Sequence, residues 1–175
     1  MKLHLRCAKP QDVDAICQIY NEAIDDRQAT LETERRDPGE RGRWLAAREA
    51  RYPVLVATED GRVVAWGSLN PFNSRPCYDG VADFSVYVAR DRRGEGLGGR
   101  LVEALIDLAR ELGYHKLVLA ALARNGAGRK LYEKMGFREV GIYREQGKLD
   151  GHWEDVLLME LLLQVPKARS ESSDR

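Results

Sequence analysis

The sequence predicts a single α/β domain, built on a mixed β-sheet that is flanked by helices. Segments that alternate polar and apolar residues are interleaved with segments of helical periodicity, in the order strand, two helices, three strands, helix, strand, helix, two strands. The chain has 175 residues, which is the usual size of one domain and too few for two well-packed cores. We expect the domain to cover residues 1–163 and a disordered polar tail to occupy residues 164–175.

The first half of the chain predicts three strands and two helices. Residues 3–7 alternate apolar and polar side chains, as in a short strand, and Pro10 then opens an amphipathic helix. Residues 30–42 are polar and contain a proline and two glycines, which is typical of a loop, and a second helix is expected around Trp44. Two strands follow, at residues 52–58 and 62–69, joined by a hairpin turn at Asp60-Gly61.

The second half of the chain predicts four strands and two helices. Residues 70–80 hold two prolines and a glycine and are expected to form a loop. Leucines recur at near-helical spacing over residues 97–112, and Gly113 supplies the stop. The other expected elements are strands at 81–88 and 116–122, a helix at 127–135 closed by Gly136, and strands at 137–147 and 153–163 around the turn Asp150-Gly151.

The composition excludes several classes of protein. Lysine plus arginine and aspartate plus glutamate both total 28, so no basic excess favours a nucleic-acid or anionic membrane partner. No apolar run approaches the roughly 20 residues of a membrane span, and the N-terminus lacks a signal-peptide core. Cys7, Cys17 and Cys77 lie far apart with no histidine at ligand spacing, which argues against disulfides and a metal site. We expect a cytoplasmic enzyme or binding domain.

The most informative segment is a strand, a glycine-rich loop and a helix at residues 85–100. Glycines let the backbone approach a ligand closely, and the helix beginning near Leu97 adds unpaired N–H groups and the positive end of its dipole. This combination favours a phosphate or pyrophosphate, to which Arg92, Arg93 and Arg100 can add charge-assisted hydrogen bonds. The loop lacks the Gly-Lys-Ser/Thr ending of a Walker motif and does not follow the first strand, as a dinucleotide fingerprint does. A plain tight turn remains the alternative.

A second motif decides between these alternatives. It consists of Asn125, Leu131-Tyr132 and Gly136-Phe137, downstream of Arg93, Gly96 and Gly98 in the loop. Together and in this order, the two motifs resemble the GNAT superfamily of N-acetyltransferases, and the resemblance covers residues 2–163. The resemblance implies a fold in which the strand before the loop splays from its parallel neighbour, and acetyl-CoA as the co-substrate, with its pantetheine arm in that opening.

The resemblance also implies roles for particular residues. Tyr132 would protonate the departing thiolate; the alternative is a helical tyrosine that only packs on the sheet. Gly128 stands where the family often has Ser or Ala, so a hydroxyl contact to the cofactor is missing. The implied cofactor-binding residues are Val86, Tyr87 and Val88 for pantetheine, Arg93, Gly94, Gly96, Leu97, Gly98 and Gly99 for the pyrophosphate, and Asn125 for the cofactor arm.

A narrower resemblance concerns the acceptor. The segments around Thr30–Thr33, Arg75–Tyr78, Asp83–Val88 and Gly147–Val156 are similar to the phosphinothricin, methionine sulfoximine and arsinothricin acetyltransferase branch. That branch implies a small zwitterionic, glutamate-like amino acid as acceptor, and resistance to such inhibitors as either the function or a side activity. The implied substrate-binding residues are Glu32, Arg75, Tyr78 and Asp83, with Arg75 on the carboxylate.

Asp83 stands where this branch usually carries a glutamate. An α-ammonium must lose a proton before it can attack a thioester, so a carboxylate here is expected to act as the base, through a water because aspartate is shorter. The alternatives are that Asp83 only positions the ammonium or is a structural acid at the strand end. Acetylation of a protein N-terminus or another amine, and a non-catalytic acyl-CoA-binding module, remain alternative functions. A homodimer is expected because the branch is commonly dimeric; core burial explains the apolar last strand equally well.

Overall fold

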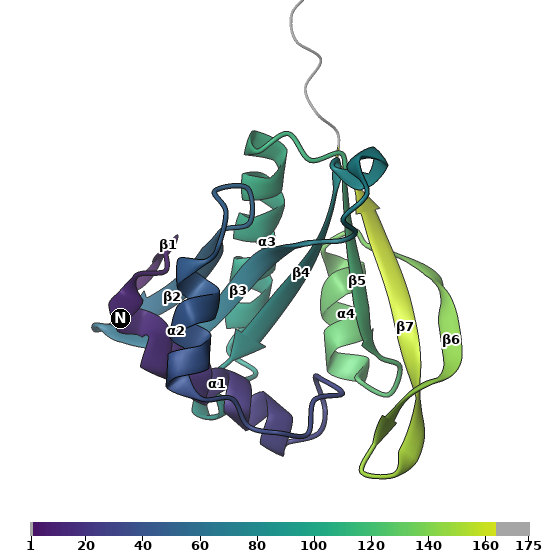
Figure 1. Ribbon diagram of the computed structural model, residues 1–175, viewed down its shortest axis with the longest axis horizontal. Coiled ribbons are helices and arrows are strands. Elements are labelled where there is room, and N and C mark those ends of the chain that lie inside the picture. Colours follow the sequence, from purple (N-terminus) through teal and green to yellow (C-terminus); the bar gives the residue numbers. More distant parts are fainter. Residues whose placement is uncertain (1, 164–175) are drawn as a thin grey trace, which may run out of the picture.

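Seven strands form one mixed sheet in the order β1-β2-β3-β4-β5-β7-β6, with helices on both faces (Figure 1). The computed structural model describes residues 2–163, so the predicted tail lies outside the described residues. The strands are β1 (Leu3–Cys7), β2 (Val54–Glu59), β3 (Arg62–Pro71), β4 (Val81–Val88), β5 (Lys116–Leu122), β6 (Arg138–Leu149) and β7 (His152–Leu162), and the helices are α1 (Val13–Asp25), α2 (Pro38–Ala46), α3 (Leu97–Glu111) and α4 (Gly126–Lys134).

The predicted element order is confirmed, with corrections at two loops. The loop expected over residues 30–42 is too long, because α2 begins at Pro38. The Asp37 side chain accepts a hydrogen bond from the Glu40 amide at 3.1 Å, and a proline at the first helical position fits this cap. The loop expected over residues 70–80 starts later, since β3 runs to Pro71, and it contains a short 3₁₀ turn at Pro76–Tyr78.

The central parallel pair separates after three residues, which confirms the predicted splay. β4 pairs with β5 only from Val81 to Asp83, opposite Lys116 to Val118, although both strands continue beyond. On its other edge, β4 stays paired with β3 from Ala82 to Val88. The opening therefore lies between the C-terminal halves of β4 and β5, where a ligand can reach unpaired backbone groups.

Two apolar clusters fill the space on the two faces of the sheet. The larger cluster joins α3 and α4 to the sheet, and the smaller joins α1 and α2 to β2 and β3. Gly67 of β3 is required by this packing, because a Cβ there would lie 2.9 Å from Leu105 Cδ1 of α3 and 2.8 Å from the Ser85 carbonyl oxygen. β7 lies between β5 and β6, and its Leu157 and Met159 belong to the larger cluster, so core burial accounts for its apolar sequence.

Candidate active site

The glycine-rich loop connects β4 to α3 and exposes the start of that helix. Gly94 and Gly96 have φ values of +83° and +78°, in the left-handed region that favours glycine. Gly96 is the residue before the first turn of α3, and no side chain caps that turn. The first amides of α3 therefore have no partner within the helix and are available to an anion, together with the positive end of the helix dipole.

Two further glycines bring α4 close to this loop. A Cβ at Gly98 would lie 3.3 Å from Leu131 Cδ2, and one at Gly99 would lie 3.5 Å from Leu131 Cδ1. The two motifs found in the sequence therefore form one cavity of about 360 Å³. It is lined by Val86, Val88, Arg92, Arg93, Gly94, Gly96, Leu97, Gly98, Gly99, Asn125, Ala127, Gly128, Leu131 and Tyr132.

The arginines of the loop are less available than the sequence suggested. Arg92 forms ion pairs with Glu59 at 2.6 Å and with Glu95 at 2.8 Å. Arg93 lines the cavity, but its Nη1 lies 2.6 Å from the Asp26 carboxylate. Arg100 lines a separate groove beside β1 and not the loop cavity. The anion site consequently depends mainly on backbone amides, while Arg93 is held by Asp26 through Nη1 and by the Val88 carbonyl oxygen through Nε.

Asn125 is the cap of α4. Its side-chain Oδ1 accepts a hydrogen bond from the Gly128 amide at 3.0 Å, so this oxygen is engaged in capping the helix, and Nδ2 is the side-chain group left to donate to a ligand. A Cβ at Gly128 would lie 2.9 to 3.2 Å from the Asn125 side chain. Gly128 therefore lets this side chain fold back over the helix start, which is the structural consequence of the departure seen in the sequence.

Tyr132 of α4 lines the same cavity. Its ring packs edge-to-face against Phe84 and Phe137, at centroid distances of 5.8 and 6.0 Å. Burial, and to a lesser extent the charge of Asp83, raises the pKa of Tyr132 to about 12. The hydroxyl is therefore protonated throughout the neutral range and able to donate a proton.

Asp83 lies at the last paired position of β4, where the splay begins. Burial raises the pKa of Asp83 to about 6, and a hydrogen bond from Asn70 opposes this shift. A carboxyl group with such a pKa is mostly ionised at pH 7 and is a stronger base than an exposed aspartate. The structure thus places a carboxylate, Asp83, at the closed end of the opening and a protonated phenol, Tyr132, in the adjoining cavity.

Tyr87 occupies a different place from the neighbouring valines, because side chains alternate along a strand. Its ring packs against Trp66 and Tyr20, at 4.9 and 5.0 Å, on the α1 side of the sheet. There it lines a second cavity of about 190 Å³ with Ala29–Leu31, Ala120–Leu122 and Val156. The Tyr87 side chain thus faces this second cavity, and only its backbone lies beside Val86 and Val88.

Among the described residues, no hydrogen bond or ion pair joins the predicted acceptor residues Glu32, Arg75 and Tyr78 to Asp83. Glu32 is exposed and pairs with Arg36 at 2.7 Å. Arg75 is exposed on the loop before β4, where its backbone amide donates to Asn73. Tyr78 packs edge-to-face on Phe72 at 5.4 Å. Their role in acceptor binding stays a prediction.

Arg48 and Asn70 are two residues near Asp83 that sequence reasoning missed. Asn70 is the direct cross-strand partner of Asp83, and Arg48 bonds to Asn70. The only local sign was a pair of polar residues, Ser68 and Asn70, in the otherwise apolar end of β3. Their significance depends on the register between β3 and β4, which the sequence does not specify.

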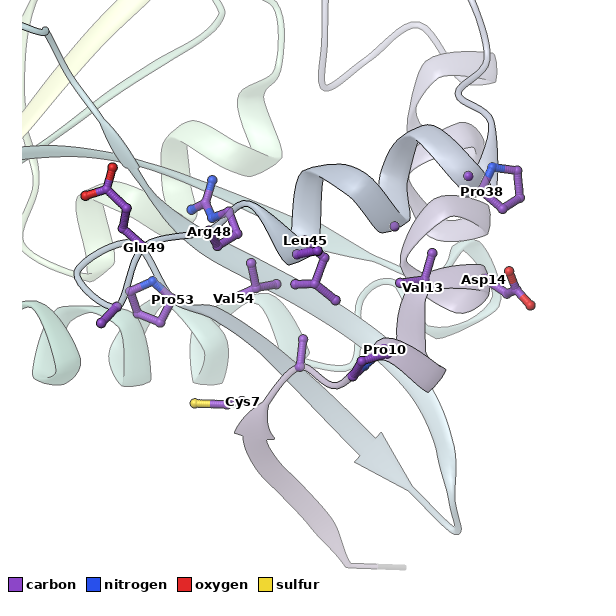
Figure 2. Close-up of a pocket in the computed structure, with 15 residues that line it drawn as sticks. Cys7, Pro10, Val13, Asp14, Pro38, Leu45, Arg48, Glu49, Pro53 and Val54 are labelled. Carbon is purple, nitrogen blue, oxygen red and sulfur yellow. The ribbon is translucent and has the colours of Figure 1, made fainter.

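A larger groove of about 750 Å³ has Arg48 among its lining residues but shares no lining residue with the glycine-loop cavity (Figure 2). Leu45 of α2 and Val54 of β2 line it together with Pro10 and Pro53, and none of the predicted site residues does so. Within residues 2–163 no group of three or more His, Cys, Asp or Glu side chains is arranged to hold a metal ion. None of the described helices is long and apolar enough to cross a membrane.

Comparison with known proteins agrees with this geometry. The model of the acetyltransferase (GNAT) family matches residues 15–137. An L-amino acid N-acyltransferase of Escherichia coli, MnaT, is 35% identical over 92% of this chain and 94% of its own length. An L-methionine sulfoximine/L-methionine sulfone acetyltransferase of Pseudomonas paraeruginosa is 34% identical over 93% of this chain and 96% of its own.

A solved structure adds a likeness with a ligand. The phosphinothricin acetyltransferase (Pat) of Sinorhizobium meliloti, in complex with AcCoA, superimposes with a TM-score of 0.88 at 25% identity, covering 93% of this chain and 89% of its own. The family match spans the glycine-rich loop, α4, Asp83 and Tyr132. The chain therefore belongs to the acetyltransferase (GNAT) family.

Proposed function

We propose that this acetyltransferase transfers an acetyl group from acetyl-CoA to the α-amino group of a small glutamate-like amino acid, of the phosphinothricin, methionine sulfoximine or arsinothricin type. Direct transfer in a ternary complex is the route. The observation that carries the proposal is the placement of Asp83 and Tyr132 at the splay of β4 and β5, next to the glycine-loop cavity. The relatives named for such acceptors support the substrate class.

The residues of the cavity fit acetyl-CoA. The unpaired amides of Leu97, Gly98 and Gly99 suit the pyrophosphate, and Val86 and Val88 of the splayed strand offer backbone groups to the pantetheine amides. Glycine at 98 keeps the cradle open, since a Cβ there would approach Leu131. Acetyl-CoA supplies an acetyl group that is activated as a thioester.

The protein's own contribution is two proton transfers, one from the acceptor's ammonium group and one to the sulfur of the departing thiolate. Asp83 accepts the proton that the acceptor's ammonium must lose, through a bridging water because the aspartate side chain is short. Tyr132 donates its proton to the sulfur as the thiolate leaves, and its protonated state at neutral pH suits this role. Burial of both groups keeps bulk water away from the exchange.

Acceptor recognition is assigned to Arg75, Tyr78 and Glu32, with Arg75 on the α-carboxylate. Arg75 forms no ion pair within residues 2–163, and its side chain is free to bind an anion.

We also propose that the protein forms a homodimer. Exposed apolar side chains on the β6–β7 hairpin, including Tyr143 and Trp153, support it. Light scattering should then give twice 19.8 kDa; a mass of 19.8 kDa contradicts the dimer.

A thiol-release assay across several acceptors tests the proposed function. Phosphinothricin, methionine sulfoximine, arsinothricin, glutamate and a panel of peptides are each offered with acetyl-CoA, and the product is identified by mass spectrometry. The proposal expects acetyl-CoA-dependent turnover with at least one of the small amino acids. Turnover with peptides alone would assign the protein to N-terminal acetylation, and acetyl-CoA binding without any turnover would make it a binding module.

A further inference from the structure

The side chain of Asp83 lies next to that of Asn70, a polar residue that has no part in the reaction proposed above. Asn70 and Asp83 are directly opposite each other in the antiparallel register of β3 and β4. The Asn70 Nδ2 atom lies 3.5 Å from Asp83 Oδ1 and 3.2 Å from Ser85 Oγ. Because an amide nitrogen carries two hydrogens, it can donate to both acceptors at once. The contact with Asp83 is at the long limit for a hydrogen bond, and the contact with Ser85 is shorter.

The orientation of the Asn70 amide is fixed from behind. Arg48 Nη2 donates to Asn70 Oδ1 at 3.1 Å, and the Ser68 hydroxyl lies 3.0 Å from the same oxygen. A guanidinium has only donors, so the Asn70 atom facing Arg48 must be the oxygen. The nitrogen of the amide is therefore turned toward Asp83. A flipped amide would set two donors against each other and present a carbonyl oxygen to a carboxylate.

Arg48 is itself held firmly. It follows α2, and Figure 2 shows it beyond Leu45 at the end of that helix. Its Nε donates to the Tyr52 carbonyl oxygen at 2.8 Å, its Nη2 also contacts the Leu69 carbonyl oxygen, and its guanidinium lies 4.9 Å from the Trp44 ring centre. It forms no ion pair with a carboxylate in the described part of the chain. Its hydrogen bonds thus serve to anchor the β3 end.

Few other groups act on Asp83. Ser85 and Tyr87 lie on the same face of β4 as Asp83. Burial, together with the charge of Asp83 as a lesser cause, raises the pKa of Tyr87 and of Tyr132 on α4, so both phenols are neutral near pH 7. Its partner in β5 is Val118. Burial is the main cause that raises the pKa of Asp83, and the Asn70 contact is the one that lowers it. Removing Asn70 should therefore leave the effect of burial without opposition.

We propose that Asn70, oriented by Arg48 and Ser68, is a positioning residue that aims the Asp83 carboxylate and keeps it ionised for proton transfer. This inference rests on the proposed role of Asp83 as the base. It also suggests how the shorter aspartate is accommodated, because Asn70 supplies a polar partner at the rear of the carboxylate. Neither Asn70 nor Arg48 is expected to touch the cofactor or the acceptor.

The test is the pH dependence of kcat/KM in the full-length enzyme, with acetyl-CoA and the best acceptor. Asn70→Leu, which has the same shape and no donor, should move the acid limb upward by about 1 pH unit. Activity should fall about fivefold at pH 6, where the wild-type carboxyl is half ionised, and stay within about threefold of the wild type at pH 8.5. Asn70→Ser, whose hydroxyl is too short to bridge the same gap, serves if the leucine variant does not fold. Arg48→Met should shift the limb in the same direction by less.

Arg51→Met is the matched control. Arg51 also lies over aromatic rings and bonds to backbone and tyrosine oxygens, yet it contacts Tyr114 and Asp79 and not Asn70. Its acid limb should match that of the wild type. A ¹³C NMR titration of the Asp83 carboxyl carbon, assigned with Asp83→Asn, gives a readout that does not depend on turnover.

The outcomes separate the inference from the function on which it rests. If Asp83→Asn removes the acid limb but both Asn70 variants keep it within about 0.3 units, the inference is overturned alone. If Asp83→Asn itself keeps the wild-type limb, the base role of Asp83 fails and the inference fails with it. An upward shift in the Asn70 variants and in the carboxyl titration, absent from Arg51→Met, supports it.

Discussion

Two carboxylates of this protein, the buried Asp12 and the partly buried Asp83, have pKa values shifted in opposite directions. Asp12 receives two hydrogen bonds from Arg6, at 2.7 and 2.9 Å, and one from the Lys9 amide, and these hold the pKa of Asp12 below its usual value. Asp83 has only the long contact with Asn70, and burial raises its pKa to about 6. At neutral pH the ionised Asp83 side chain therefore lowers folding stability, because its pKa is raised in the folded state. The ionised Asp12 side chain contributes stability, because its pKa is lowered.

Asp83→Asn should raise the free energy of unfolding at pH 7. The folded-state pKa of about 6 lies above the ordinary value of 3.8, so ionisation at neutral pH disfavours the folded state, by at most about 3 kcal/mol. The gain should shrink as the pH falls from 6 to 4, where the wild-type carboxyl is protonated in the folded state. Urea unfolding at several pH values measures it. Asp12→Asn, the control, should destabilise at pH 7; a loss of stability in Asp83→Asn contradicts the argument.

Tyr132→Phe should lower kcat by about 10²-fold or more while leaving the KM for acetyl-CoA within about threefold. The ring contacts with Phe84 and Phe137 remain, and only the proton donor is lost. Steady-state kinetics with a thiol reporter measures both parameters. Tyr143→Phe is the control, because that tyrosine is exposed on β6. Near-normal kcat in Tyr132→Phe would show that the thiolate leaves without this hydroxyl.

At the scale of elements, the start of α3 is what presents the anion site. Gly96 has φ +78°, so Gly96→Val should distort the turn that aims the first amides of the helix. Acetyl-CoA affinity should fall at least about 10-fold by calorimetric titration. Gly151→Val is the matched control: Gly151 has φ +85° in the β6–β7 turn, with nothing near its Cβ position. It should lose stability without losing affinity. If both variants lost acetyl-CoA affinity equally, the loss in Gly96→Val would reflect impaired folding and not a distorted anion site.

The sequence predicted elements better than it predicted their ends. The β4–loop–α3 unit was predictable because its strand, its glycines and its leucine periodicity are contiguous. The start of α2 was not predicted, because residues 30–42 are polar as in a loop. The cap and proline at Asp37-Pro38 are the local signal that indicates this helix start. The splay came from the family resemblance, and no local pattern indicates where β4 and β5 separate.

At the scale of the whole molecule, what stayed hidden depends on contacts between distant segments. The loop arginines were expected at the phosphate, but Glu59 of β2 and Asp26 after α1 engage them. Asn70 faces Asp83 only because β3 and β4 pair in one register across a nine-residue connection, Phe72 to Gly80. Residue chemistry was thus predictable from motifs, whereas the partners that tune it required the fold.

Removal of the acceptor's ammonium proton by Asp83 is the central step of the proposed reaction. The pH profile of kcat/KM tests this step directly. For the wild type, turnover of the small amino-acid acceptor should rise through a midpoint near 6, the raised pKa of Asp83. Asp83→Asn should lose this limb, and its rate should instead climb toward the pKa of the free amine, while acetyl-CoA binding stays intact. An identical limb near pH 6 in both proteins would contradict the assignment of Asp83 as the base.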